Sequence, residues 1–151
     1  MDKKRETGKY DALKLERQLC FPLYAASRKV IGLYHPYLSA LDLTYTQYIT
    51  LMVLWQEGSE SVKELGRRLY LDSGTLTPLL KSMEKKGLIV KKRSEKDERS
   101  VIVAPSESGM ALRERALGIP EKVGNCLGID GEEALALRSL LYGIIGAEQE
   151  K

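Results

Sequence analysis

The sequence predicts a mainly α-helical protein with one small β-hairpin, and three observations lead to this fold class. Apolar residues recur at spacings of three and four over most of the 151 residues, which is the period of an amphipathic helix. Residue types that favour helix N-caps precede several of these stretches. Two β-branched segments, 88–93 and 101–104, flank a charged tip and are typical of a hairpin. Length and composition predict one domain, residues 1–151.

The first helical region runs from Leu13 to about Leu38, where an apolar stripe continues without a gap. Pro22 interrupts this region, because a proline inside a helix removes a backbone hydrogen bond and clashes with the preceding turn. We therefore expect either a helix kinked at Pro22 or a helix that begins near Phe21.

The C-terminal region should contain two more helices. Ser106 is a candidate cap for a helix that runs toward Leu127 with a kink at Pro120, and Asp130 is a candidate cap for the last helix. The last helix has a broad apolar surface, which we interpret as partly a subunit interface. Residues 13–40 and 106–150 would then form a helical dimerisation region.

The middle of the chain, residues 44–105, shows a different order of elements. The sequence contains capping boxes at 44–47 and 61–64, a turn at 71–74, and a helix that Gly87 ends before the hairpin begins. A short helix, a tight turn, a second helix and a hairpin with a charged tip make a winged helix-turn-helix, in which the second helix fits the major groove of DNA. The alternative is a small helical domain whose hairpin is only a connector.

Positive charge is concentrated in this same segment. The whole chain carries +3, but residues 61–104 hold 11 Lys/Arg and 6 Asp/Glu, a net charge of +5. A local basic excess favours a polyanion partner, although a solvated basic face would look the same. We expect double-stranded DNA as the partner. The residues expected to reach it are Asp72, Ser73, Thr75, Thr77 and Lys81 on the second helix, and Lys96 and Arg99 at the hairpin tip.

Several classes of protein are disfavoured by composition. The two cysteines are too few for a disulfide scaffold, and one histidine without a Cys/His cluster argues against a zinc site. The sequence has no apolar stretch of the length a membrane span needs and no signal peptide, so we expect a cytoplasmic protein with no membrane contact. Nucleotide-binding and HExxH motifs are absent, and we expect no cofactor, no metal and no enzymatic activity.

Several motifs resemble the MarR family of bacterial transcription regulators. They are residues 69–80 (LYLDSGTLTPLL), Gly87-Leu-Ile, and 97–100 (DERS). Residues 18–24 (QLCFPLY) and 43–48 (LTYTQY) are similar to the organic-hydroperoxide-sensing repressors of that family. The resemblance implies a homodimer that binds a pseudo-palindromic operator, with Asp97 and Arg99 at the wing tip. It also implies an organic hydroperoxide as the signal.

Within this resemblance Cys20 is the residue that reacts with the peroxide. Exposed thiolates are oxidised to sulfenic acids, but by its type alone Cys20 could equally be an inert, buried helix residue. The family places two tyrosines around the thiol, and the matching residues are Tyr34 and Tyr45. On one continuous helix Tyr34 would lie ~21 Å from Cys20, so these two tyrosines would come from the partner subunit, whereas Tyr24 could approach Cys20 within one chain. Plain interface packing is the alternative role for all three.

The route after oxidation depends on Cys126. The resemblance leaves two options: Cys126 forms an intersubunit disulfide with Cys20, or a low-molecular-weight thiol traps the sulfenic acid. Pro22 departs from the family pattern, and a break there would place Cys20 at a helix N-terminus. Two other functions stay open: a MarR-type repressor released by a small aromatic ligand in a dimer-interface pocket, and a thiol peroxidase.

Overall fold

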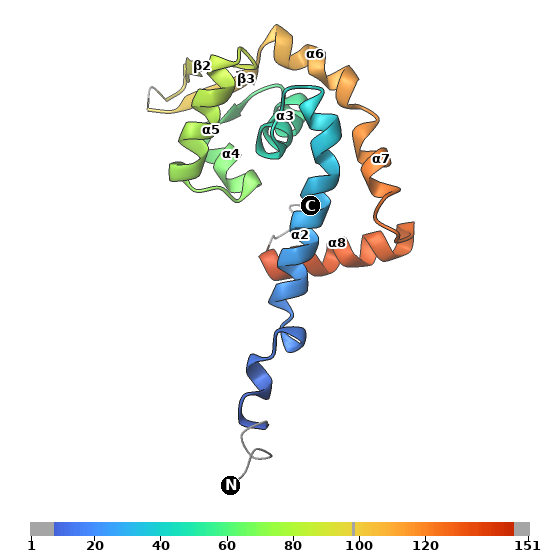
Figure 1. The fold of residues 1–151 in the computed structure, drawn as a ribbon. Coiled ribbons are helices and arrows are strands. Elements are labelled where there is room, and N and C mark those ends of the chain that lie inside the picture. The colour runs from blue at the N-terminus through green and yellow to red at the C-terminus, as the bar shows by residue number, and fades with distance from the viewer. Residues whose placement is uncertain (1–7, 98, 147–151) are drawn as a thin grey trace.

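The computed structural model describes residues 8–97 and 99–146, and the mainly helical prediction is confirmed (Figure 1). Three helices from the middle of the chain and a small sheet form one lobe, and the other helices lie around it or extend from it. In chain order the elements are η1 (Asp11–Leu13), η2 (Leu15–Arg17), α2 (Cys20–Ser39), α3 (Tyr45–Glu57), β1 (Glu60–Ser61), α4 (Val62–Leu69), α5 (Ser73–Lys85), β2 (Ile89–Arg93), β3 (Val101–Pro105), α6 (Glu107–Ala116), α7 (Ile119–Gly124) and α8 (Gly131–Ile145).

The helix N-termini are capped largely as expected. Thr44 and Asp130 form full capping boxes at α3 and α8. The box expected at 61–64 is only half formed: the Ser61 hydroxyl accepts from the Glu64 N–H, but the Glu64 carboxylate pairs with Arg67. Glu60 takes the missing role, because its carboxylate accepts from the Ser61 N–H at 2.9 Å.

The sheet has a third strand that the sequence did not predict. Its order is β1-β3-β2, all antiparallel, with Glu60 opposite Val103 and Arg93 opposite Val101. The two residues of β1 are too few for any periodic pattern, so only the pairing with β3 reveals them. Together with the helices beneath, the third strand supports a hairpin that would be marginal alone.

The core of the lobe lies between α3, α4, α5 and the sheet. Its central side chains have no exposed surface, and the carboxyl end of α2 closes it with Leu38. The described apolar residues with no exposed surface are Leu51, Leu54, Leu65, Met83 and Val103.

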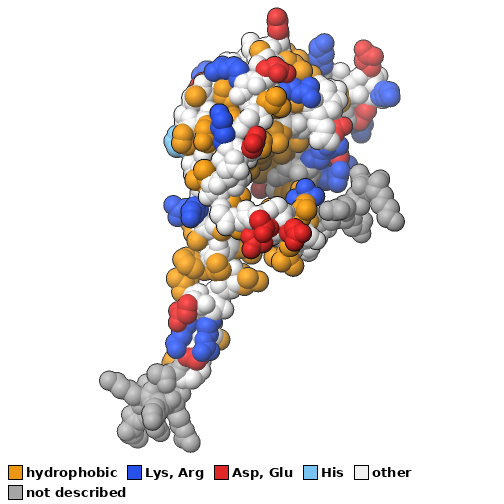
Figure 2. Space-filling model, turned by 90° about the vertical axis from the view of Figure 1, so that its right-hand side faces the viewer, with side chains coloured by type: hydrophobic (Ala, Val, Ile, Leu, Met, Phe, Trp, Pro, Cys, Tyr) orange, Lys and Arg blue, Asp and Glu red, His pale blue; other side chains and the backbone are white. Residues whose placement is uncertain are grey.

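Of the two predictions for the first helical region, a single helix from Leu13 that is kinked at Pro22 is wrong. The other prediction, a helix that begins near Phe21, is confirmed. Two 3-10 turns precede α2, and Gln18 between them and α2 has extended backbone angles. The helix starts at Cys20, so Pro22 falls in its first turn, where a missing N–H costs nothing. This amino-terminal stretch projects from the lobe as a stalk that carries hydrophobic side chains (Figures 1 and 2).

The C-terminal region also differs from the prediction. The helix expected from Ser106 toward Leu127 is divided into α6 and α7 at Leu117–Gly118, and Pro120 begins the second helix rather than kinking a longer one. In α8 no described residue is buried, and its apolar side chains are exposed. Among the described residues no helix has both the length and the apolar character to span a membrane.

Candidate DNA-binding surface and redox site

The turn between α4 and α5 is tightly packed. Tyr70 ends α4 in the left-handed conformation, with φ of 52°. A Cβ at Gly66 would lie 3.0 Å from the Leu71 carbonyl oxygen, so glycine allows the chain to turn back closely over α4. Asp72 then caps α5, its carboxylate accepting from the Thr75 N–H at 2.8 Å. The contribution of Asp72 is therefore the geometry of the turn.

The helix α5 divides into a buried side and a polar side. Leu76, Leu80 and Met83 are buried in the lobe. The side chains predicted to reach DNA remain exposed, with Thr77 and Lys81 one turn apart. This is the arrangement that a helix needs if it is to lie in the major groove while staying anchored to the domain. The exposed predicted residues of the helix are Ser73, Thr75, Thr77 and Lys81.

The wing tip is held by two side chains. The Ser94 hydroxyl accepts from the Lys96 and Asp97 N–H groups at 3.2 and 3.4 Å. The Asp97 carboxylate accepts from the Arg99 N–H at 3.0 Å and from the Ser100 hydroxyl at 2.8 Å. Both bonds lower the pKa of the Asp97 carboxyl group, and the bond from the Arg99 backbone N–H has the larger effect. Asp97 therefore shapes the tip, while Lys96 and Arg99 stay exposed.

The wing and α5 are connected to each other. The Lys91 ammonium on β2 lies 3.1 Å from the Glu84 carboxylate on α5. Both elements lie on the same side of the molecule in Figure 1. Exposed Lys92 and Arg93 add positive charge that the sequence prediction did not single out.

Cys20 is the first residue of α2, and its thiol is free and exposed. The expected helix break is therefore present, but four residues before Pro22, at Gln18. Tyr24 lies one turn beyond Cys20, but its hydroxyl accepts from Arg28 at 3.2 Å, and the Arg28 guanidinium lies 5.5 Å from the Tyr24 ring centre. Tyr24 thus contacts Arg28, one turn further along α2, and in the described part of the chain no hydrogen bond joins it to Cys20.

Tyr34 and Tyr45 lie together at the centre of an aromatic cluster. Their ring centres are 5.1 Å apart, and Tyr48 is 5.8 Å from Tyr34. Burial raises the pKa of all three phenols, and the neighbouring phenols raise that of Tyr48 further, to about 12. All three phenols are therefore protonated at neutral pH, when their hydroxyls can donate hydrogen bonds.

The cysteine and the two predicted tyrosines do not meet within one chain. Cys20 and Tyr34 belong to the same continuous helix α2, whose rise places them ~21 Å apart. The structure thus brings Tyr34 and Tyr45 together and leaves Cys20 at the far end of α2.

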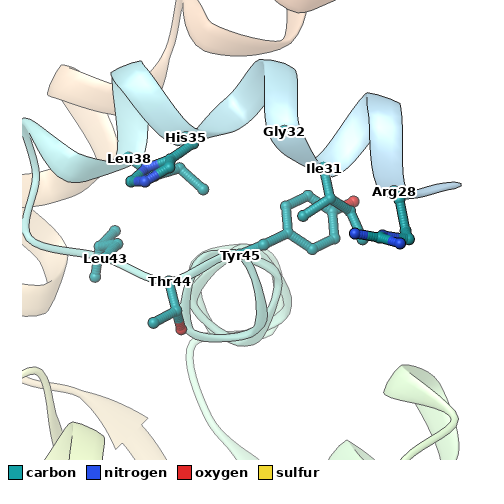
Figure 3. Close-up of a pocket in the computed structure, with 8 residues that line it drawn as sticks. All are labelled: Arg28, Ile31, Gly32, His35, Leu38, Leu43, Thr44 and Tyr45. Atoms are coloured by element: carbon teal, nitrogen blue, oxygen red, sulfur yellow. The ribbon is translucent and has the colours of Figure 1, made fainter.

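A pocket of about 450 Å³ opens beside Tyr45, between α2 and the start of α3 (Figure 3). Ile31, Leu38 and Leu43 supply apolar wall, while Arg28 and His35 supply polar groups along α2. The sequence did not locate this pocket, because its lining comes from two elements whose packing no local pattern encodes.

Cys126 is free and exposed just after α7. Its thiol donates to the Lys122 carbonyl oxygen at 3.3 Å, and the Lys122 ammonium lies 5.6 Å from the Tyr37 ring centre. Because Tyr37 belongs to the last turn of α2, Lys122 lies near the opposite end of that helix from Cys20 of the same chain.

A small helical core that carries an exposed helix and a basic wing is the architecture of a winged-helix DNA-binding regulator. The chain has this architecture. Comparisons with known proteins agree. The family described as Transcriptional regulator SarA/Rot matches residues 32–115. The organic hydroperoxide resistance transcriptional regulator of Bacillus subtilis is 49% identical over 147 residues, which cover 95% of this chain and 98% of the relative. The regulator SarZ of Staphylococcus aureus is 46% identical and covers 80% of this chain and 81% of its own length.

A solved structure of reduced AbfR bound to DNA is similar with a TM-score of 0.73 and 31% identity, and it covers 93% of this chain and 98% of AbfR. AbfR, from Staphylococcus epidermidis, is also known in a disulfide-formed structure, with a TM-score of 0.62. This chain belongs to the MarR-type transcriptional regulators, in the SarA/Rot branch. The resemblance to the organic-hydroperoxide-sensing group is thereby confirmed.

Proposed function

We propose that the protein is a homodimeric DNA-binding repressor that senses organic hydroperoxides through oxidation of Cys20 and then releases its operator. The observation that carries the proposal is the exposed Cys20 thiol at the first residue of α2, in a chain whose relative is named for organic hydroperoxide resistance. The DNA-bound structure of AbfR supports the DNA-binding part.

The dimer is proposed from the unpaired apolar surface of the single chain. Leu140 and Ile144 on α8 are 68% and 64% exposed, and Leu13 and Leu19 on the stalk are 77% and 71% exposed. Surfaces of this kind in a monomer mark interaction sites. A second copy would cover them and could bring its Tyr34 and Tyr45 near Cys20, which the distance along α2 prevents within one chain.

The chemistry begins at the Cys20 sulfur. The thiolate attacks the terminal oxygen of the hydroperoxide, the O–O bond breaks, and the alkoxide takes up a proton and leaves as an alcohol. Cys20 becomes a sulfenic acid, oxidised by two electrons. Protonated tyrosine hydroxyls near the sulfur would stabilise the thiolate by hydrogen bonding before the reaction.

The second step removes the sulfenic acid. The thiolate of Cys126 in the partner subunit attacks the Cys20 sulfur, hydroxide leaves as water after protonation, and an intersubunit disulfide remains. A low-molecular-weight thiol would give a mixed disulfide by the same chemistry. Lys122, four residues before Cys126, contacts Tyr37 in the last turn of α2. This contact disfavours a Cys20–Cys126 bond within one chain, because the Cα atoms must come within ~7 Å.

DNA contact is assigned to α5 and the wing. Thr77 and Lys81 would face the major groove, and Arg99 would enter the minor groove, where the potential is most negative. A symmetric dimer would read two half-sites about one helical turn apart. Moving the interface helices after oxidation would spoil that spacing and release the DNA.

A gel shift with the upstream DNA of the protein's own gene tests the proposal. The reduced protein should bind, and an organic hydroperoxide should release it. Cys20→Ser should bind equally well and stay bound, because a hydroxyl forms no sulfenic acid. If Cys20→Ser still leaves the DNA after peroxide treatment, the sensor assignment is wrong.

A second candidate is a repressor released by a small aromatic ligand. The apolar pocket beside Tyr45 favours it, because about 450 Å³ lies within the range of small-molecule sites. This candidate predicts release by an aromatic ligand without any oxidant, equally in the wild type and in Cys20→Ser.

A further inference from the structure

Two polar contacts connect the corner between α2 and α3 to the recognition helix α5. The Lys86 ammonium, at the carboxyl end of α5, donates to the Asp42 carbonyl oxygen at 2.6 Å and lies 3.1 Å from the Asp42 carboxylate. The Gln47 side-chain amide, in the first turn of α3, donates to the Ser82 hydroxyl at 3.3 Å. Because Ser82 and Lys86 are four residues apart, both contacts use the same flank of α5.

Gln47 is fixed at both ends of its amide. Its oxygen accepts from the Thr44 N–H at 3.1 Å while its nitrogen reaches Ser82, and the residue is only 4% exposed. A buried amide with both ends engaged has one orientation, so the first turn of α3 and the flank of α5 move together or lose a hydrogen bond.

Tyr45 lies within that same first turn, between Thr44 and Gln47. Its ring packs on Tyr34 and lines the pocket in Figure 3. The corner itself is in a restrained conformation, because Asp42 has φ of 53°, in the left-handed region. A change at the Tyr45 ring is therefore only two residues along α3 from Gln47 and its bond to Ser82.

We propose that Gln47 and Lys86 are positioning residues that couple the tyrosine site to α5, so that displacement of Tyr45 shifts the recognition helix. The inference rests on the proposed peroxide-sensing function. The coupling needs no contact between the sensor site and DNA, because packed elements pass small displacements along contiguous contacts. The polar clamp, defined as Asp42–Lys86 and Gln47–Ser82, is a direct polar connection between these two parts.

The test uses the double variant Ser82→Ala/Lys86→Met in the full-length protein. Operator affinity is measured for the reduced and for the peroxide-oxidised protein. The readout is the dissociation constant of the oxidised protein divided by that of the reduced protein. We expect the ratio to fall ~10-fold relative to the wild type, in the usual range of allosteric coupling. The operator affinity of the reduced double variant should match that of the reduced control Lys85→Met, which removes the same charge from the same end of α5.

A merely structural role gives a different result. If the two contacts only support the structure, the double variant changes the operator affinity of the reduced and of the oxidised protein by the same factor. An unchanged ratio would therefore overturn the coupling. Ser82→Ala alone, at an exposed position, provides a second variant that should fold and show a smaller fall in the ratio. A wild type that ignores peroxide would instead refute the sensing function, and the coupling with it.

Discussion

At the wing tip, some side chains hold the shape of the loop and others stay exposed, where the proposed DNA contact would be made. Asp97 and Ser94 are occupied by hydrogen bonds within the tip, whereas Lys96 and Arg99 remain exposed. The same division holds at α5, where Asp72 caps the helix and Thr77 and Lys81 face outward. Residues that look alike in a sequence motif thus have different roles in the folded chain.

Arg99→Ala should weaken operator binding by ~1–3 kcal/mol, the usual value of one specific groove contact. Arg99→Lys is the matched control, because it keeps the charge but loses the planar guanidinium. Fluorescence anisotropy with operator and scrambled DNA measures both variants. If Arg99→Ala binds the operator as tightly as the wild type at physiological salt, Arg99 is not part of the site.

The tyrosine cluster predicts a loss of stability in alkali. Unfolding restores the ordinary phenol pKa of about 10, whereas the folded pKa of Tyr48 is raised to about 12. Above pH 10 the unfolded chain therefore binds fewer protons than the folded one, and the free energy of unfolding falls as pH rises toward 12. The full contribution of the Tyr48 phenol to the free energy of unfolding is present below pH 10.

Urea unfolding across this pH range measures the slope. Tyr48→Phe should make the decline shallower, because the substituted ring has no proton to lose. An identical slope in Tyr48→Phe would show that Tyr48 does not control the alkaline transition.

At the scale of elements, the join between the hairpin and α6 depends on close backbone approach. A Cβ added to Gly109 would lie 2.1 Å from the Leu88 carbonyl oxygen, and the Trp55 indole N–H donates to the Gly109 carbonyl oxygen at 2.9 Å. The Ser106 hydroxyl donates to the Gly87 carbonyl oxygen in the same join. These contacts fix where α6 leaves the DNA-binding lobe.

Gly109→Ala should destabilise the protein by at least ~3 kcal/mol, the upper end of the cost of overpacking, because backbone rather than a flexible side chain blocks the Cβ. Gly124→Ala is the control, since a Cβ there has no neighbour within 4 Å. Thermal melts of both variants give the comparison. A Gly109→Ala protein as stable as Gly124→Ala would contradict the close packing.

At the scale of the whole molecule, the described part of the single chain leaves two stretches of apolar surface uncovered. α8 and the stalk carry exposed leucine and isoleucine side chains, and Figure 2 shows hydrophobic groups along the stalk. The proposed dimer would use both.

Leu140→Glu should convert the dimer to a monomer and abolish tight operator binding, because a charge in an apolar interface is left without a partner. Ser139→Glu adds the same charge one position away on α8. Light scattering gives the mass, and circular dichroism shows whether the fold is retained. A dimeric Leu140→Glu protein would exclude this part of α8 from the interface.

Peroxide should produce a covalent dimer on non-reducing gels, and a reductant should reverse it. The covalent dimer should be absent in Cys126→Ser, whose Cys20 would then stay open to small thiols. Mass spectrometry of the oxidised wild type decides between the routes. A mixed disulfide at Cys20 with Cys126 reduced would establish the small-thiol route instead.

The local elements were predictable because they depend on short-range chemistry. The caps at Thr44, Ser106 and Asp130, the helix ended by Gly87, and the hairpin all follow from hydrogen bonds and backbone angles set within a few residues. The exposed side of α5 was predictable in the same way, from the helical spacing of its apolar residues.

Tertiary structure alone decided the rest. The strand β1 exists because residues 60–61 pair with β3, some forty residues away. The division of α6 from α7 and the pocket beside Tyr45 depend on how helices pack, which a local apolar pattern does not encode. The sequence by itself determined the type of each element and the residues that carry the chemistry. Packing between distant segments determined where those residues meet, because contacts distant in sequence form only when the whole core closes.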